Sequence, residues 1–203
     1  MPRIFLLSPA HCGGKRAQML LREAAQFDLA TRLRREGAPL GEVFAFLSGL
    51  YFRGKLAYAA KFAQPPTGWP GALVITTNRG LLAAETIVTH GELCALGAVP
   101  IDGSDPRYAE PLDRDAARLA TVADCEVVLL GSIATGKYVE RFLPLLGERL
   151  RFPAEFVGRG DMSRGGLMLR AAASGEELSY VPVAGAIRHG ARPPKLTPRR
   201  SRD

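Results

Sequence analysis

The amino-acid sequence predicts an α/β fold, a three-layer α/β/α sandwich with a short, mostly parallel central sheet. Short apolar runs alternate with stretches of helical periodicity, which is typical of a largely parallel sheet. Hydrophobic residues make up 47% and charged residues 23% of the 203 residues, as in ordinary globular domains. A chain of this length supports one sizeable core, so we expect a single α/β domain over residues 1–189 and a tail over residues 190–203.

The N-terminal part of the chain is expected to hold one strand followed by helices. An apolar run opens the sequence, and the segments after it carry apolar and aromatic residues at helical spacing. Gly49 and Gly54 lie inside the longest segment and are expected to divide it into two helices. Tyr51, Arg53 and Lys55 are candidates for a stacking and phosphate-binding edge there. The predicted elements are a strand over residues 3–8 and helices over residues 15–21, 27–35 and 40–62.

The rest of the chain is expected to supply three further strands and the helices between them. Residues 65–71 hold three prolines and two glycines and predict a loop. Residues 180–187 form either an added edge strand or an extended anchor for the tail. The predicted strands cover residues 72–77, 125–130 and 151–157, a short helix lies within residues 82–98, longer helices cover residues 112–123, 137–150 and a stretch from residue 167, and irregular turns cover residues 106–111 and 158–166.

The charge of the chain favours an anionic partner. The formal net charge is +7 and the pI is near 9.7, and a basic surface attracts phosphate chains. Residues 190–203 hold five Lys or Arg and one acid, a contribution of +4 that leaves +3 for the rest. This Pro-rich segment is expected to be disordered, as an arm that touches nucleic acid or as a solubilising tail. We expect nucleic acid as the partner, and DNA rather than RNA.

The cysteines and histidines predict neither a metal site nor a cofactor. Three cysteines at wide spacing, with no C-x-x-C pair, support neither a disulfide framework nor zinc. His90 and Cys94 would share a helix face, but two ligands do not make a tetrahedral site. Cys12 lies beside Lys15 and Arg16, which favour a thiolate, so it is either a catalytic thiol or a loop residue.

Membrane and secretion signals are not expected in this sequence. No apolar run approaches the ~18 residues that a membrane span needs. The apolar run near the N-terminus is far shorter than the core of a signal peptide and is better explained as the first strand. We therefore expect no membrane association and a cytoplasmic location.

Residues 127–138 have the spacing of a phosphate-binding loop. An apolar run is followed by Gly131, Gly136 and Lys137 in the Walker A pattern, in which backbone N–H groups and a lysine hold phosphates. Tyr138 stands where a Ser or Thr would ligate Mg²⁺, and the loop follows a late strand instead of the first one. We therefore expect a strand–turn–helix unit whose N–H groups meet one phosphate, and not a nucleotide-hydrolysing loop.

Four predicted strands each run into a polar turn, and most of these turns contain glycine. Open parallel sheets bind ligands outside the carboxyl ends of their strands, where helix N-termini supply N–H donors. We therefore expect the four turns to converge on one cleft. The turns are residues 8–16, 76–80, 131–138 and 158–166.

The order of these turns resembles the uracil-DNA glycosylase superfamily, over most of residues 3–170. In that family a first strand-end loop activates water, an apolar strand ends in an Asn that reads the base, and a last strand leads into a loop that enters the minor groove. The G-x-D-P-Y and H-P-S motifs of the family are absent. Uncharacterised bacterial domains of this general class are similar through I75-T-T-N-R-G-L-L82. The corresponding stretches are S8-P-A-H-C12, L73-V-I-T-T-N78, V127-V-L-L-G-S-I-A134 and F156-V-G-R-G-D-M-S-R164.

An enzyme of this kind needs groups that hold a flipped base and stabilise the charges of the transition state. We assign catalysis to Asn78, which would read the base, to His11, which would stabilise the leaving base or activate water, and to Asp161, which would orient water or balance the cationic sugar. Tyr51 or Phe52 would stack on the base. The other candidates are Ser8, Cys12, Gly131, Ser132 and Tyr138 for substrate binding and Lys15, Arg16, Lys137, Arg159 and Arg164 for phosphate binding.

The sequence therefore predicts a nucleic-acid-acting enzyme, with hydrolysis of the N-glycosidic bond of a modified or damaged base as the leading reaction. Two alternatives stay open, a non-catalytic DNA- or RNA-binding protein and an enzyme of small-molecule nucleotides or nucleosides. Structural roles also stay open for two residues. Asn78 is suited to a turn, and Asp161 is suited to an ion pair with Arg159 or Arg164 or to a helix cap.

Overall fold

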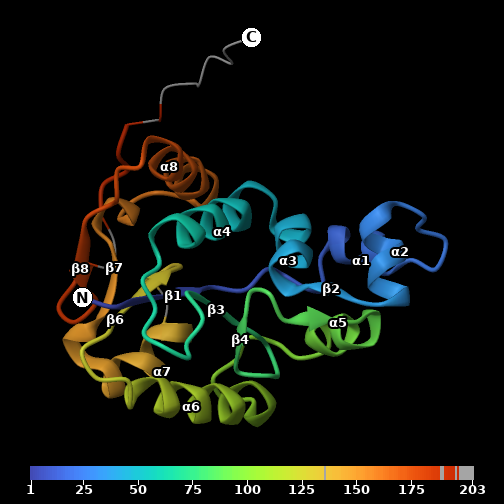
Figure 1. The fold of residues 1–203 in the computed structure, drawn as a ribbon, viewed down its shortest axis with the longest axis horizontal. Helices are drawn as coiled ribbons and strands as arrows, with labels where there is room; N and C mark the ends of the chain where they lie inside the picture. The colour runs from blue at the N-terminus through green and yellow to red at the C-terminus, as the bar shows by residue number, and fades with distance from the viewer. Residues whose placement is uncertain (135, 188–189, 195, 197–203) are drawn as a thin grey trace.

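A six-stranded sheet lies in the middle of the computed structural model, which describes residues 1–134, 136–187, 190–194 and 196 (Figure 1). The strand order is β4-β3-β1-β6-β7-β8. The four inner strands are parallel, and the two edge strands are antiparallel to their neighbours. The strands are β1 (Arg3–Leu7), β3 (Ala72–Ile75), β4 (Leu81–Ala83), β6 (Glu126–Leu130), β7 (Leu150–Pro153) and β8 (Tyr180–Pro182).

Helices cover both faces of the sheet and give three layers (Figure 1). One face carries α4 (Leu50–Phe62) and α8 (Asp161–Ser174), and the other carries α6 (Pro106–Ala120) and α7 (Gly136–Leu146). The predicted α/β fold with a mostly parallel sheet is thereby confirmed. None of the helices that the structure describes is both long and apolar enough to cross a membrane.

The remaining helices lie to one side of the sheet, around a two-stranded ribbon of β2 and β5 (Figure 1). Two short 3-10 helices flank β7. The ribbon strands are β2 (Ala38–Pro39) and β5 (Ile87–Val88), the side helices are α1 (Lys15–Leu21), α2 (Asp28–Arg35), α3 (Leu40–Ser48) and α5 (His90–Gly97), and the 3-10 helices are Gly147–Arg149 and Ala154–Phe156.

The inner strands are buried because helices cover the sheet from both sides. β1 and β6 pair in parallel, with Phe5 opposite Val128 and Leu7 opposite Leu130. Four of the five β1 residues and all five β6 residues are buried. Their apolar runs are therefore continuous instead of alternating, which is why these runs predict both strands correctly.

Two predicted breaks are wrong for the same physical reason. The sequence predicts a turn over residues 158–166, but α8 begins at Asp161 and contains Gly165. The sequence also predicts that Gly54 divides a helix, but α4 continues through that residue. A Cβ on Gly54 would lie 2.6 Å from the Gly165 carbonyl oxygen, and one on Gly165 would lie 2.8 Å from the Leu50 carbonyl oxygen. Both glycines therefore serve a close crossing of α4 and α8, not a turn.

Gly49 and Pro106 lie at helix ends, where glycine and proline act through their own backbone conformations. Gly49 has a φ of 61° and separates α3 from α4, as the sequence predicts. The sequence predicts irregular structure over residues 106–111, but α6 begins at Pro106. Proline suits the first position of a helix because its φ is already helical. No hydrogen bond is lost there, since the backbone N–H at that position has no partner within the helix. Asp105 caps the helix by accepting a hydrogen bond from the Arg107 N–H at 2.9 Å.

The shortest elements are the ones that the sequence does not resolve. Residues 82–98 are predicted to hold one short helix and a connection, and they contain most of β4, all of β5 and α5. The strand predicted over residues 151–157 ends at Pro153 and gives way to a 3-10 helix, and the helix predicted over residues 137–150 ends at Leu146. β8 confirms the edge strand within residues 180–187.

The predicted disordered tail is described only in part, since residues 195 and 197–203 lie outside the described residues. The stretch 190–194 lies against the start of α8. Arg159 donates a hydrogen bond to the Pro194 carbonyl oxygen at 3.3 Å, and a Cβ on Gly158 would clash with the Ala191 carbonyl group. This part of the tail is therefore in contact with the domain.

Gly165→Ala is expected to lower the free energy of unfolding by about 1–3 kcal/mol, because the added methyl group would overlap the α4 backbone at Leu50 and Tyr51. Urea unfolding at equilibrium measures the change. Gly91→Ala is the matched control, since Gly91 lies in α5 with open space at its Cβ position and alanine favours a helix. A Gly165→Ala protein as stable as the wild type would contradict the close crossing.

Candidate functional site

Five side chains from three segments meet at the carboxyl end of the sheet, and we call them the strand-end cluster. They are Ser8, which follows β1, Tyr51 and Lys55 of α4, and Asp161 and Arg164 of α8. Tyr51 and Lys55 are four residues apart and therefore share one face of α4. The close crossing of the two helices brings that face against the first turn of α8.

Lys55 is the centre of the cluster. It is 1% exposed, and its Nζ donates hydrogen bonds to the Ser8 carbonyl oxygen (2.9 Å) and to the Ser8 Oγ (2.7 Å). The Nζ also lies 3.9 Å from the centre of the Tyr51 ring. Burial lowers the pKa of Lys55 to about 7, while the Asp161 charge opposes this shift and the Arg164 charge adds to it. The amino group therefore takes up and releases a proton near neutral pH.

The Tyr51 hydroxyl is buried in the same cluster and has no well-aligned hydrogen-bond partner, although Arg164 and Ser8 lie within hydrogen-bonding reach of it. Burial raises the pKa of Tyr51 to about 12, whereas the contacts with Arg164 and Ser8 act in the opposite direction. Folded proteins rarely leave a buried polar group poorly paired, and each such group needs an explanation. A bound ligand could complete the hydrogen bonding of this hydroxyl.

Asp161 and Arg164 form the rim of the cluster. The Asp161 side chain is 69% exposed and the Arg164 side chain 12%, with Arg164 Nη1 3.8 Å from Asp161 Oδ1. Arg164 is held in place by two hydrogen bonds to the Phe156 carbonyl oxygen, at 3.1 and 3.2 Å. Asp161 lies in the first turn of α8, where the helix dipole favours a carboxylate. The rim thus presents one negative and one positive charge to a ligand.

The turn after β6 lies beside Ser8. A Cβ on Gly131 would be 2.9 Å from the Ser8 Cβ and 3.2 Å from the Ser8 Oγ, so the turn packs directly against Ser8 and leaves no room there for a larger residue. Tyr138, in the first turn of α7, is buried. Burial raises its pKa, and the nearby Tyr51 and Asp161 add to the rise. Two further predicted substrate-binding residues, Gly131 and Tyr138, therefore lie close to the cluster, which already contains Ser8 and Tyr51.

The three predicted catalytic residues line three different cavities. His11 lines one of about 450 Å³ together with Cys12 and Lys137, Asn78 lines a second of about 510 Å³, and Asp161 lines a third of about 750 Å³. Asn78 donates a hydrogen bond from Nδ2 to a backbone carbonyl of α5 at 2.9 Å, and its Oδ1 is buried without a partner. The structure does not bring His11, Asn78 and Asp161 into one cavity.

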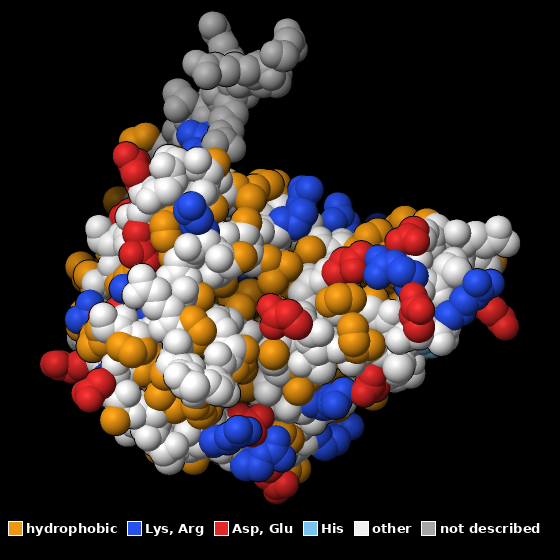
Figure 2. Space-filling model, in the orientation of Figure 1, with side chains coloured by type: hydrophobic (Ala, Val, Ile, Leu, Met, Phe, Trp, Pro, Cys, Tyr) orange, Lys and Arg blue, Asp and Glu red, His pale blue; other side chains and the backbone are white. Residues whose placement is uncertain are grey.

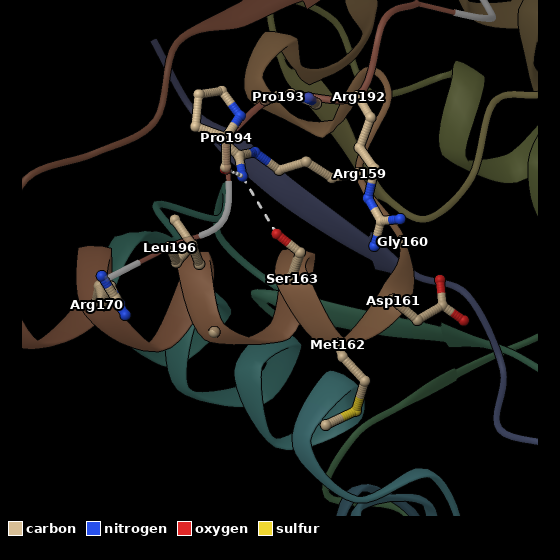
Figure 3. A pocket seen from close by; sticks show the side chains of 11 residues that line it. Arg159, Gly160, Asp161, Met162, Ser163, Arg170, Arg192, Pro193, Pro194 and Leu196 are labelled. Atoms are coloured by element: carbon tan, nitrogen blue, oxygen red, sulfur yellow. Dashed lines mark hydrogen bonds between the residues drawn. The ribbon is translucent and has the colours of Figure 1, made fainter. Parts of the chain in front are cut away.

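Figure 3 shows the third cavity, which lies between α8 and the C-terminal segment. Arg159 reaches Ser163 Oγ at 3.2 Å from one side of it, and Arg192 lines it from the C-terminal segment. The Asp161 carboxylate points away from Arg159 and Ser163 in this view. Asp161 lines this cavity and is also a member of the strand-end cluster, so the cavity adjoins the cluster.

The structure corrects three predictions about individual residues. Phe52 is fully buried and packs edge-to-face against Phe44, with the ring centres 5.4 Å apart, so it offers no face to a base. Cys12 is buried, and burial raises the pKa of its thiol to about 12, which is the opposite of the predicted thiolate. Lys55 is buried in the cluster instead of lying on an exposed phosphate-binding edge.

The predicted phosphate-binding residues do not form one group. Lys15 is exposed at the start of α1, and Arg16 beside it donates a hydrogen bond to the Phe46 carbonyl oxygen at 3.0 Å. Lys137 lines the cavity of His11, Arg159 lines the third cavity, and Arg164 lies on the rim of the cluster. Ser132 holds its own turn, since its Oγ accepts a hydrogen bond from the Ala134 N–H at 3.3 Å. Among the described residues, no group of three His, Cys, Asp or Glu side chains could hold a metal ion.

Sequence reasoning missed the contact between Ser8 and Lys55. The signal for it lies in the helical spacing of α4, because Lys55 stands three residues from both Phe52 and Tyr58, which are fully buried. A lysine within a buried stripe has to find partners for its amino group. Those partners come from the end of β1, 47 residues away in sequence, and the pattern of α4 alone does not identify them.

The stability of the protein is expected to depend on the protonation of Lys55. The unfolded chain holds this proton up to about pH 10.5, whereas the folded protein releases it near pH 7. Between these values the unfolded state binds more protons, so this group makes the free energy of unfolding rise with pH, by at most about 1.4 kcal/mol per pH unit. Lys55→Met is expected to remove that slope and to be more stable than the wild type at pH 7.

Urea unfolding between pH 7 and pH 10 measures the slope, and the difference between variants removes the contribution of other titrating groups. Lys61→Met is the matched control, because Lys61 lies in the same helix but is exposed. We expect the wild type and Lys61→Met to share one slope and Lys55→Met to have a smaller one. Three parallel curves would show that the folded protein keeps the Lys55 proton in this range.

Comparisons with protein-family models, curated proteins and solved structures find no match for this chain. The resemblance to the uracil-DNA glycosylase superfamily therefore rests on strand order and spacing alone. The geometry of the strand-end cluster is the feature of the molecule that points to a function.

Proposed function

We propose that this protein is an enzyme that acts on a nucleotide unit of nucleic acid, DNA rather than RNA, bound at the strand-end cluster. The observation that carries the proposal is the buried Lys55 amino group, which Ser8 holds at the end of β1 and whose pKa is about 7. Ionisable groups with strongly shifted pKa values gather at catalytic sites. Open α/β sheets bind their ligands at the carboxyl ends of the strands. Both rules favour the same place in this molecule.

The distribution of charge supports a phosphate-bearing substrate. Arg164 belongs to the cluster, Arg159 and Arg192 line the adjoining cavity, and the net charge of the chain is +7. On the face in Figure 2, Lys and Arg side chains are interspersed with Asp and Glu. On this face, the distribution fits a nucleic acid held by a few local phosphate contacts better than one held along a continuous basic track.

The N-glycosidic bond of a modified or damaged base is the bond that the sequence resemblance implies. Its cleavage places positive charge on the sugar and negative charge on the departing base. Asp161 is suited to balance the charge of the sugar, and Arg164, with the Tyr51 hydroxyl close by, is suited to stabilise the base anion. This version of the reaction has no role for His11 and Asn78, because they line other cavities.

DNA duplexes that contain uracil, 5-hydroxymethyluracil or other altered bases test the proposal. Abasic sites are scored by cleavage in alkali, and direct strand breaks are scored without it. We expect product with the wild type and a loss of roughly 100-fold or more with Asp161→Asn and with Lys55→Met, since each removes a charge or proton carrier from the site. Asp28→Asn is the matched control, because Asp28 also lies in the first turn of a helix and pairs with an arginine, Arg32, at 2.9 Å.

Two other results would overturn the proposal. Salt-sensitive DNA binding without any product would establish a non-catalytic binding protein. Turnover of free nucleotides or nucleosides without action on DNA or RNA would establish a small-molecule enzyme. Equal activity of Asp161→Asn and Asp28→Asn would place the reaction outside the strand-end cluster.

A further inference from the structure

Ser8 and Lys55 have the geometry of a nucleophile and its base. The Lys55 Nζ lies 2.7 Å from the Ser8 Oγ, which is within reach of direct proton transfer. The Ser8 carbonyl oxygen holds the same Nζ at 2.9 Å, and the Tyr51 ring lies against it. These two groups fix the direction of the amine, so that a neutral Lys55 is positioned to accept the Ser8 proton.

The groups that face Lys55 set its protonation state. Burial and the charge of Arg164 lower the pKa of the amine to about 7, and the charge of Asp161 opposes this shift. The Ser8 hydroxyl carries no charge. Tyr51 is also uncharged near pH 7, because burial raises its pKa to about 12. A serine hydroxyl is a weak nucleophile until a base takes its proton. Lys55 is such a base above about pH 7, without help from a histidine.

The groups around the Ser8–Lys55 pair are suited to an anionic electrophile. The Tyr51 hydroxyl lies close to both Ser8 and Arg164, and each of these residues lowers its pKa. Charge spreads over the phosphoryl oxygens when a phosphate ester is attacked. A guanidinium group and a phenolic hydroxyl are donors that would stabilise this charge.

We propose that Ser8 is the nucleophile and Lys55 the general base of a phosphodiester-cleaving site. The bond from Ser8 Oγ to phosphorus forms as the bond from phosphorus to one ester oxygen breaks. The Ser8 proton passes to Lys55 Nζ, and Lys55 returns it to the departing alkoxide. Water then hydrolyses the phosphoserine ester, which regenerates Ser8 and releases a phosphate monoester. This inference depends on the proposed function in one respect, the nucleotide as the substrate.

A fluorophosphonate probe tests the pair without any nucleotide. The Ser8 Oγ bonds to the probe phosphorus, fluoride leaves, and the Ser8 proton passes to Lys55. We expect one adduct per chain, located by mass spectrometry on the peptide that contains Ser8, at a rate that rises with pH through about 7. Ser8→Ala is expected to abolish the adduct, and Lys55→Met to slow it by roughly 100-fold or more. Ser104→Ala, which changes an exposed turn, is the control and is expected to label at the wild-type rate.

Hydrolysis of bis(4-nitrophenyl) phosphate measures turnover by the same variants. Tyr51→Phe removes only the hydroxyl and keeps the ring that packs against Lys55, so we expect the fold to stay intact. It is expected to lower turnover by about 10-fold, the value of one hydrogen bond to a charged group. Urea unfolding confirms that Lys55→Met and Tyr51→Phe are folded in the assay buffer.

The possible results separate this inference from the proposed function. No Ser8 adduct in the folded protein, or an adduct that forms equally fast in the wild type and in Lys55→Met, would overturn the inference. Abasic sites in altered DNA without a Ser8 adduct would overturn it as well and leave the proposed function standing. A Lys55-dependent adduct together with no action on nucleic acid would uphold the pair and overturn the proposed function.

Discussion

The backbone contact between α4 and α8 is the constraint on which the candidate site depends. Side chains usually keep packed helix axes about 8–10 Å apart, and Gly54 and Gly165 remove the Cβ atoms that would enforce that distance. The close approach excludes water from the α4 face that carries Lys55. It also brings the first turn of α8 over the end of β1. The shifted pKa of Lys55 and the burial of the Tyr51 hydroxyl both follow from this arrangement.

A buried amine at this position costs stability that the rest of the core has to offset. Phe52 and Tyr58, on either side of Lys55 along the helix, are fully buried, and an apolar side chain of similar length would continue their stripe. The two oxygens of Ser8 offset the burial of the amine only in part. The free energy of desolvating an ammonium group usually exceeds the free energy gained from its new hydrogen bonds. Local rules that are broken without a structural benefit are expected at functional sites, and Lys55 is the clearest such position here.

The sequence predicts the fold well because the fold depends on local patterns. The continuous apolar runs of β1 and β6 identify buried parallel strands, and the helical spacing of α2, α3 and α4 identifies their helices. The errors lie where the roles of glycine and proline differ from the predicted turns. Gly165 is predicted in a turn and lies in a helix crossing, and Pro106 is predicted in an irregular stretch and begins α6.

The site is less predictable because its parts are far apart in the sequence. The rule that strand ends converge correctly places Ser8, Gly131, Tyr138 and the start of α8 near one another. The same rule also places Asn78 and His11 there, which is wrong, because each lines a separate cavity. It also says nothing of which helix covers the strand ends. The pairing of Ser8 with Lys55 depends on that helix, so it could be seen only in the structure.

The contact of the C-terminal segment with α8 makes this segment one wall of the third cavity. Its members there are Arg192, Pro193, Pro194 and Leu196. The segment is held by the hydrogen bond from Arg159 to the Pro194 carbonyl oxygen and by the approach of Leu196 to Gly166. The shape and the charge of the cavity therefore depend on a segment outside the sheet and its covering helices. Loss of this segment would open the cavity and remove the Arg192 charge while the sheet stays intact.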